Sequence, residues 1–511
     1  MARVKPTSLS LSCYLQITAA LADLAAAADA APPGAGNEPS AASLAFVAAF
    51  GAFASLLVLP NSKALHKQLL AAMSRLPRAV FEPSMRELAR RLADAAHRRL
   101  DGELADALSS IIAMQPAHEL ALTAMDCFVV VLVRALARGV VLAQAAVLGG
   151  VPTTPHAAEC THSALGVLYA LVVRTGPHVL ASPTAGAAEV EALSDIVDAC
   201  LDCLQQPTLS RDVALTAAVT LTAGACLHLS AADAGALLAN TLFTAHGAPA
   251  FVPDAPPPAA CVLDTLVLQP RGRSLASEVS RCTPFGRLCM LKALVAAAPP
   301  EALLLPLHVL AADASDDQST RNWTLLLDGV LPELCALAET TTCAHVRYHA
   351  VSGAASGVTR LATAVAACGA DGRAPPCLPP ALHARLMAVV WGGWEDPQPQ
   401  VVKSVQTLFE AMLACDDVGR APAVALDAAL TLLRVGPRKG KYGPLTTLVR
   451  RARGSALLAA HPGLLFDTLL ECEEETLCTA ASGFLRALSE ECVCPCLHAC
   501  MPTTRSRAAS D

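Results

Sequence analysis

The sequence predicts an all-α protein, an α-solenoid of irregular HEAT/armadillo-like helical repeats. Hydrophobic residues make up 54% of the 511-residue chain but aromatic residues only 4%, so the core must consist of small aliphatic side chains. Ala and Leu favour helices, and few segments show the apolar alternation typical of strands. In addition, 36 Pro and 29 Gly separate short apolar helices that cannot bury their apolar sides without stacking on neighbours.

Loops rich in Pro and Gly divide the chain. We expect a poorly ordered N-terminal segment over 1–40, which can hold a short helix. Helical-repeat blocks are predicted over 41–246, 261–367 and 381–491. A Pro-rich loop over 247–260 and a second loop over 368–380 separate these blocks, and a Cys-rich disordered tail follows over 492–511.

One segment near the N-terminus raises the question of a membrane. Residues 44–59 contain no charged side chain, and their length approaches the ~20 residues that a membrane span needs. Ala and Gly dilute the hydrophobicity, however, and no basic cluster flanks the segment. We therefore favour a helix buried inside a cytoplasmic protein that does not contact membrane, and keep a membrane anchor through 44–59 as the alternative.

Helical periodicity is clearest over Gln400–Leu413, which follows a capping Asp396-Pro397 turn. Its apolar stripe comprises Val401, Val402, Val405, Leu408, Phe409, Met412 and Leu413. A similar stripe is present over Thr476–Leu488. The segment Met85–Leu100 also has helical spacing, with arginines on its polar side, and we interpret that side as solvated surface rather than a nucleic-acid contact.

Sequence motifs for catalysis, cofactor binding and metal binding are missing from the chain. It contains no phosphate-binding loop, no dinucleotide fingerprint and no nucleophile elbow, so we predict no enzyme and no cofactor. Most of the 20 cysteines should be reduced core residues, including Cys200 and Cys203 on one helix. The C-terminal run of Cys and His from Cys492 to Cys500 lacks the usual zinc spacing, so no metal is predicted there; zinc stays the alternative.

A basic cluster near the C-terminal end is the candidate binding site. Lys439 and Lys441 lie in a Gly-rich loop, and Arg450, Arg451 and Arg453 follow on or beside a short helix. Clustered Lys and Arg side chains can bind phosphates, which makes RNA or a protein partner the predicted ligand. The alternative is a solvated ridge, because the chain as a whole carries a formal charge of −7.

Several segments of the chain resemble the plant and algal branch of the THADA (thyroid adenoma-associated) family. The resemblance covers roughly 285–492 and involves packing and turn motifs rather than catalytic ones. The matching segments are Phe285-Gly286-Arg287-Leu288-Cys289-Met290, Trp323-Thr324-Leu325-Leu326-Leu327-Asp328-Gly329-Val330-Leu331-Pro332, Trp394-Glu395-Asp396-Pro397, Lys439-Gly440-Lys441-Tyr442-Gly443-Pro444-Leu445, His461-Pro462-Gly463-Leu464-Leu465-Phe466 and Leu477-Cys478-Thr479-Ala480-Ala481-Ser482-Gly483-Phe484-Leu485.

This resemblance implies a large helical-repeat protein that assists an FtsJ-type tRNA 2′-O-methyltransferase. In that family the partner enzyme holds the catalytic residues and S-adenosylmethionine, and the helical protein positions tRNA for modification in the anticodon loop. The Arg-Arg-Ser-Ala-Gly block of the family has no counterpart here. We therefore expect the chain to correspond to the N-terminal and central portion of such a protein. A general protein–protein interaction scaffold is the alternative function.

Overall fold

The computed structural model describes residues 128–150, 155–175, 187–207, 210–244, 250–252, 261–310, 322–371, 378–417, 441–452, 454–472 and 477–492, with positions 20, 430, 432 and 433. Nearly all of these residues lie in helices, which confirms the predicted all-α fold of irregular helical repeats. Contacts divide the chain into two compact units, Met1–Leu325 and Leu326–Asp511. The predictions for 1–40, 44–59, 85–100 and 493–511 fall outside the described residues.

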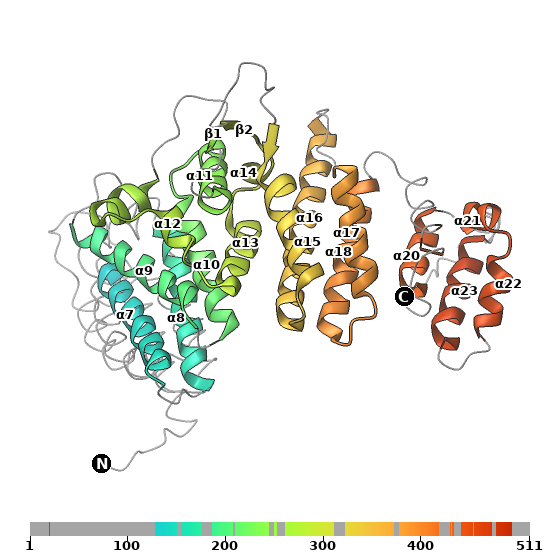
Figure 1. The fold of residues 1–511 in the computed structure, drawn as a ribbon, viewed down its shortest axis with the longest axis horizontal. Coiled ribbons are helices and arrows are strands. Elements are labelled where there is room, and N and C mark those ends of the chain that lie inside the picture. Colours follow the sequence, from blue (N-terminus) through green and yellow to red (C-terminus); the bar gives the residue numbers. More distant parts are fainter. Residues whose placement is uncertain are drawn as a thin grey trace, which may run out of the picture. The chain divides into compact units, whose positions relative to one another are not determined.

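In the described part of the first unit, helices pack on one another and on helices one or two places further along the chain (Figure 1). Helix α7 contacts α8 and α9, and α10 contacts α8, α9 and α13. The bounds are α7 (Phe128–Leu148), α8 (Pro155–Thr175), α9 (Ala187–Gln205), α10 (Arg211–Ala225), α11 (Ala231–Phe243) and α13 (Pro284–Ala297). Ten of the fifteen residues of α10 are buried, and half of these are Ala, so these helices approach closely without large side chains.

Hydroxyl side chains set the starts of several helices in this unit. Ser210 accepts a hydrogen bond from the backbone N–H of Val213 at the start of α10, and Ser230 accepts one from Asp233 at the start of α11. Thr283 does the same for Gly286 in α13, where Pro284 also fixes the first turn. These caps satisfy backbone donors that have no partner inside the helix, and therefore define the helical boundaries locally.

A buried carboxylate holds the connection between α11 and α13 together. This connection contains a π-helical turn η2 (Leu263–Leu268), a 3-10 turn η3 (Gln269–Arg271) and α12 (Leu275–Val279). The Glu278 side chain is 2% exposed and pairs with Arg273 Nε at 3.0 Å and Arg281 Nη1 at 3.1 Å. Gln205 Nε2 of α9 donates to the same carboxylate at 2.9 Å. The hydrogen bond from Arg273 is the main cause that lowers the pKa of Glu278.

We expect Glu278→Gln to destabilise the protein by about 2 kcal/mol at neutral pH, because it weakens charge-assisted hydrogen bonds to a buried group. The folded-state pKa lies below the ordinary value of 4.5, so the stabilisation is present above that value and is lost as the pH falls through the folded pKa. Urea unfolding at several pH values should therefore show the two proteins converging in acid. A stability difference that stays constant down to low pH would contradict this origin.

A small sheet corrects two of the sequence predictions. Strand β1 (Ala250–Val252) lies inside the predicted loop 247–260, and β2 (Pro306–Leu310) and β3 (Asn322–Thr324) lie inside the predicted helical block 261–367. The order is β1-β2-β3 with antiparallel pairing, Phe251 opposite Val309 and Leu307 opposite Trp323. Strand β1 pairs with residues almost sixty positions away, and β2 pairs with β3 across more than ten residues, so local periodicity could not reveal these strands.

The Asn240 side chain of α11 fixes strand β1. Its Nδ2 donates to the carbonyl oxygen of Phe251 at 2.7 Å, and its Oδ1 accepts from the N–H of Phe251 at 2.9 Å. The ring of Phe251 packs on that of Trp323 with centroids 4.2 Å apart. Both a backbone clamp and an aromatic contact therefore hold this strand in place.

The second unit begins with a π-helical turn, η4 (Leu325–Val330), whose first residue belongs to the first unit. Four helices follow, α15 (Leu331–Thr340), α16 (Ala344–Asp371), α17 (Pro380–Gly393) and α18 (Pro399–Asp417), and then α20 (Tyr442–Ala452), α21 (Gly454–Ala460), α22 (Leu464–Cys472) and α23 (Cys478–Cys492). Helix α16 packs extensively on α18. The first residues of the predicted loop 368–380, up to Asp371, belong to α16, and the contacts divide the chain into units between 325 and 326.

The predicted apolar stripes form the core of the second unit. In α18, Val401, Val405, Leu408, Phe409, Met412 and Leu413 are buried, whereas Val402 is only half-buried. In α23, the buried side chains include Ala481, Phe484 and Leu488. Helical spacing of apolar residues therefore identified the inward faces of both helices correctly.

Candidate partner-binding site at helices α20 and α22

Helix α20 carries the described part of the predicted basic cluster. Its inner face consists of Tyr442, Leu445, Leu448 and Val449, all of which are buried. Arg450, one position beyond Val449, is exposed on the outer face. The apolar side therefore anchors the helix and leaves the last turn to present a guanidinium group to solvent.

Lys441 is engaged within the protein rather than freely exposed. Its Nζ lies 2.8 Å from Glu471 Oε1, and their side chains are only 15% and 18% exposed. The Tyr442 hydroxyl donates to Glu471 Oε2, and the Lys441 Nζ lies 5.1 Å from the centroid of the Tyr442 ring. This group joins the start of α20 to the last turn of α22, so its first role is to hold two helices together.

The structure describes some of the five predicted contact residues and not others. Lys441 is in the ion pair with Glu471, and Arg450 is exposed without an ion pair among the described residues. Arg451 lies in the last turn of α20, and its side chain is outside the described part of the chain. Lys439 and Arg453 also fall outside it. Contact of these residues with RNA or a partner stays a prediction.

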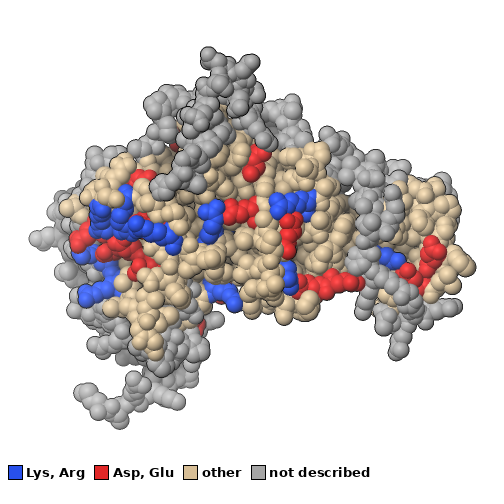
Figure 2. All heavy atoms as spheres, viewed as in Figure 1, with Lys and Arg blue, Asp and Glu red and all other residues tan. Residues whose placement is uncertain are grey.

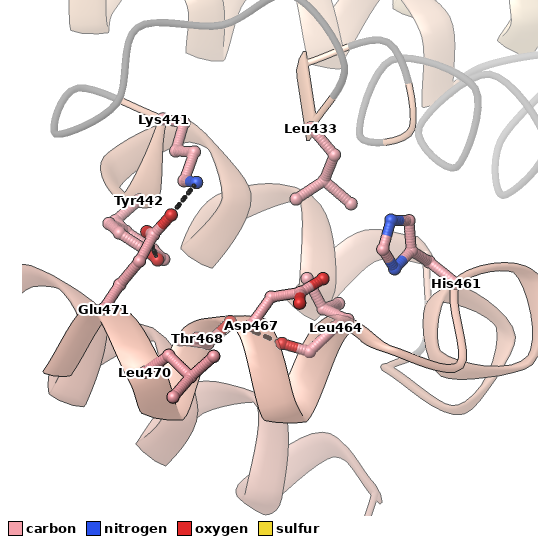
Figure 3. Close-up of a pocket in the computed structure, with 9 residues that line it drawn as sticks. All are labelled: Leu433, Lys441, Tyr442, His461, Leu464, Asp467, Thr468, Leu470 and Glu471. Carbon is pink, nitrogen blue, oxygen red and sulfur yellow. Dashed lines mark hydrogen bonds and ion pairs between the residues drawn. The ribbon is translucent and has the colours of Figure 1, made fainter.

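A cavity of about 310 Å³ lies between α20, α22 and the turn that precedes α22 (Figure 3). Lys441, Tyr442 and Glu471 line one side, and His461 lines the other. Asp467 and Thr468 of α22 lie between them, and Leu433, Leu464 and Leu470 supply apolar surface. The cavity is therefore a polar recess that contains two carboxylates. Lys441 neutralises that of Glu471, and the other belongs to Asp467.

Two polar groups in this recess have no partner among the described residues. The carboxylate of Asp467 has no ion pair or hydrogen bond to another described residue, and its residue is exposed. The Nδ1 atom of His461 is buried and has no hydrogen-bond partner among the described residues. A carboxylate beside an imidazole nitrogen can accept hydrogen bonds from an amine or a guanidinium group.

The cysteines contribute packing rather than a binding centre in the described regions. Ten described cysteines are free thiols, of which five are buried, including Cys200 and Cys203, and three are half-buried. Burial raises the pKa of Cys203 to about 12 and that of Cys289 to about 12, which keeps both thiols protonated at neutral pH. The prediction that Cys200 and Cys203 are core neighbours is confirmed. Among the residues that the structure describes, no group of three His, Cys, Asp or Glu side chains could hold a metal ion.

Arginines of the first unit are largely paired with carboxylates on α9. Arg134 of α7 contacts Glu191 at 2.8 Å and Asp195 at 3.2 Å, while Arg271 and Arg273 reach Asp198 at 2.9 and 2.8 Å. Figure 2 shows basic and acidic residues interleaved on the visible face. Because these guanidinium groups are matched by carboxylates, the described residues here do not form a continuous basic track for a phosphate backbone.

Within the described regions, no helix combines the length and the apolar character that crossing a bilayer requires.

Comparisons with known proteins find similarity to solved structures at low sequence identity. No family model and no curated protein matches the chain. A crystal structure of Kap121p is 11% identical with a TM-score of 0.34, covering 93% of this chain and 46% of that one, so the chain spans just under half of its length. SYS-1 is 11% identical with a TM-score of 0.24, covering 95% of this chain and 89% of that one. Similarity this low does not bear on function.

Proposed function

We propose that this chain is a non-catalytic helical-repeat scaffold that assists tRNA 2′-O-ribose methylation in the anticodon loop. In this proposal it acts in the cytoplasm, docks an FtsJ-type methyltransferase and positions tRNA against the basic residues around α20. The enzyme and the tRNA are inferred from the resemblance to the THADA family. The observation that carries the RNA contact is the exposed Arg450 on a helix whose other face is firmly buried.

The C-terminal end of α20 is suited to an arginine cluster that meets phosphates. A helix C-terminus carries partial negative charge, which stabilises Arg450 and Arg451 in the last turn of α20. Guanidinium groups bind phosphate oxygens through two parallel hydrogen bonds, which positions a strand without reading its sequence. Arg453 follows directly in the sequence and adds a third charge within four residues.

A quadruple variant, Lys439, Arg450, Arg451 and Arg453 each to Ala, tests the RNA contact. If each residue meets one phosphate, the slope of log K against log salt should become shallower by about 3, and affinity should fall about a hundredfold at low salt. The measurement is fluorescence anisotropy with a labelled anticodon stem-loop at several KCl concentrations. Circular dichroism should show unchanged helicity, because Arg450 is exposed.

A second variant with the same change in net charge provides the control. Arg134, Arg271, Arg281 and Arg385 each pair with carboxylates elsewhere in the chain, and their replacement by Ala should leave the salt slope unchanged. Equal binding by the cluster variant and the wild type at moderate salt would remove the RNA proposal. Lys441 is substituted separately, since its removal also takes away the partner of Glu471.

The enzyme contact needs a different experiment. We expect an FtsJ-type methyltransferase to co-purify with the tagged full chain from its own cells, and methyl transfer to tRNA to require both proteins. Methylation by the purified chain alone would overturn the scaffold proposal, and absence of any methyltransferase would overturn its docking part.

A further inference from the structure

The outward face of helix α22 is entirely apolar. Leu464 and Thr468 point into the unit and are 2% exposed, whereas Phe466 is 66% exposed and Leu469 is 56% exposed on the opposite side. Leu465 and Leu470 are 43% and 51% exposed and complete the same face. A surface helix normally turns polar side chains to water, so a whole apolar face in solvent indicates a contact with another molecule.

The neighbouring helix α23 shows that this apolar face is specific to α22. The two helices pack on each other, and α23 buries Ala481, Phe484 and Leu488. Its exposed positions are polar or small and include Ser482, Arg486, Ser489 and Glu490. Helix α23 therefore has an ordinary polar face toward solvent, whereas α22 does not.

An acidic group, Asp467, borders the apolar face. Asp467 lies between the apolar face and the recess of Figure 3, and has no ion pair among the described residues. Leu470 belongs to the apolar face and also lines that recess, so the two are continuous. The side of α22 that faces the recess therefore carries the negative charge of Asp467 beside exposed apolar side chains.

We propose that this surface of α22 binds an amphipathic helix of a partner protein, one with aliphatic side chains along one face and Arg or Lys beside them. The aliphatic residues would cover Leu465, Phe466, Leu469 and Leu470. One basic side chain would enter the recess, where Asp467 accepts its hydrogen bonds and His461 Nδ1 offers a further acceptor. Charge selects this partner over a second copy of the chain, because a copy packed on the same face would bring its own Asp467 close to this one.

The proposal does not depend on tRNA, and a defined peptide tests it on the full chain. The probe is a labelled helix of about 18 residues, long enough to be helical in isolation, with Leu on one stripe and Arg beside it. A second peptide replaces each Arg by Glu and keeps the Leu stripe. Fluorescence anisotropy should show binding of the Arg peptide and at least tenfold weaker binding of the Glu peptide, a difference that salt reduces.

Variants of α22 locate the binding. The double variant Phe466→Ser with Leu469→Ser should lower the affinity for the Arg peptide about tenfold or more. Asp467→Asn should lower it by a smaller factor. The matched control is Leu142→Ser on α7, an apolar side chain of similar exposure, 53%, in the first unit. Because these side chains are exposed, thermal unfolding should be nearly unchanged. If the double variant were to unfold, Asp467→Asn would still test whether the peptide binds at α22.

Several outcomes would overturn the inference. These are equal binding of the two peptides, equal loss in the Leu142 control, or no loss in any α22 variant. Light scattering that shows a dimer abolished by Leu469→Ser would assign the face to a second copy instead. Loss of RNA binding in the α20 variant with intact peptide binding, or the reverse, separates this inference from the tRNA proposal.

Discussion

Gly286→Ala is expected to destabilise the first unit by about 3 kcal/mol, because the new methyl group would collide with backbone rather than a movable side chain. Gly286 lies in the first turn of α13, where this helix meets the end of α9. The backbone N–H and the hydroxyl of Thr283 both donate to the carbonyl oxygen of Leu204, at 3.0 and 3.1 Å. A Cβ atom at position 286 would lie 2.2 Å from that same oxygen.

Urea unfolding of the full chain, followed by circular dichroism, measures this effect. The matched control is Gly139→Ala within α7, where nothing lies within 4 Å of the added atom. There the substitution should stabilise the helix by about 0.5–1 kcal/mol, because Ala has the higher helix propensity. If the two variants proved equally stable, the close approach of α13 to α9 would not constrain this position.

Arg347→Met is expected to destabilise the second unit by about 3 kcal/mol. The Arg347 Nε lies 2.6 Å from Asp396 Oδ2, and the side chain of Asp396 is only 5% exposed. The other oxygen, Oδ1, accepts from the N–H of Gln398 just before α18. Removing the guanidinium leaves a buried carboxylate without its charge partner, and dehydration of that carboxylate is costly.

A double-mutant cycle separates the pair from the general effect of each change. Adding Asp396→Asn to Arg347→Met should recover at least half of the lost stability, because no charge is then left buried. Arg385→Met is the control, since its partner Glu339 is exposed and such pairs contribute at most about 1 kcal/mol. Equal losses for Arg347→Met and Arg385→Met would show that burial does not strengthen this pair.

Local patterns predicted the helices well but not their distant partners. The spacing of Val405, Leu408 and Met412 indicated the buried face of α18, and Asp396 was expected to cap the turn before it. These features depend on neighbours within a few residues. The strands β1–β3 depend instead on pairing between distant segments and on Asn240, which no periodicity reveals.

The candidate site shows the same limit. Lys441 belongs to a basic cluster in the sequence, yet Glu471, thirty positions away on another helix, neutralises it. The segment Leu464–Cys472 is apolar almost throughout, so the sequence could not tell which side of α22 faces inward. Only the packing of α22 on α23 distinguishes the buried Leu464 from the exposed Phe466.

The clamp between Asn240 and Phe251 has a consequence for the solubility of the protein. Strand β1 is an edge strand of its sheet. An edge strand with free N–H and C=O groups is a template on which another chain can add a strand and aggregate. The carboxamide of Asn240 occupies both groups of Phe251. A single side chain thus prevents a strand of another chain from pairing with β1. Sheets more often obtain this protection from charged side chains or proline.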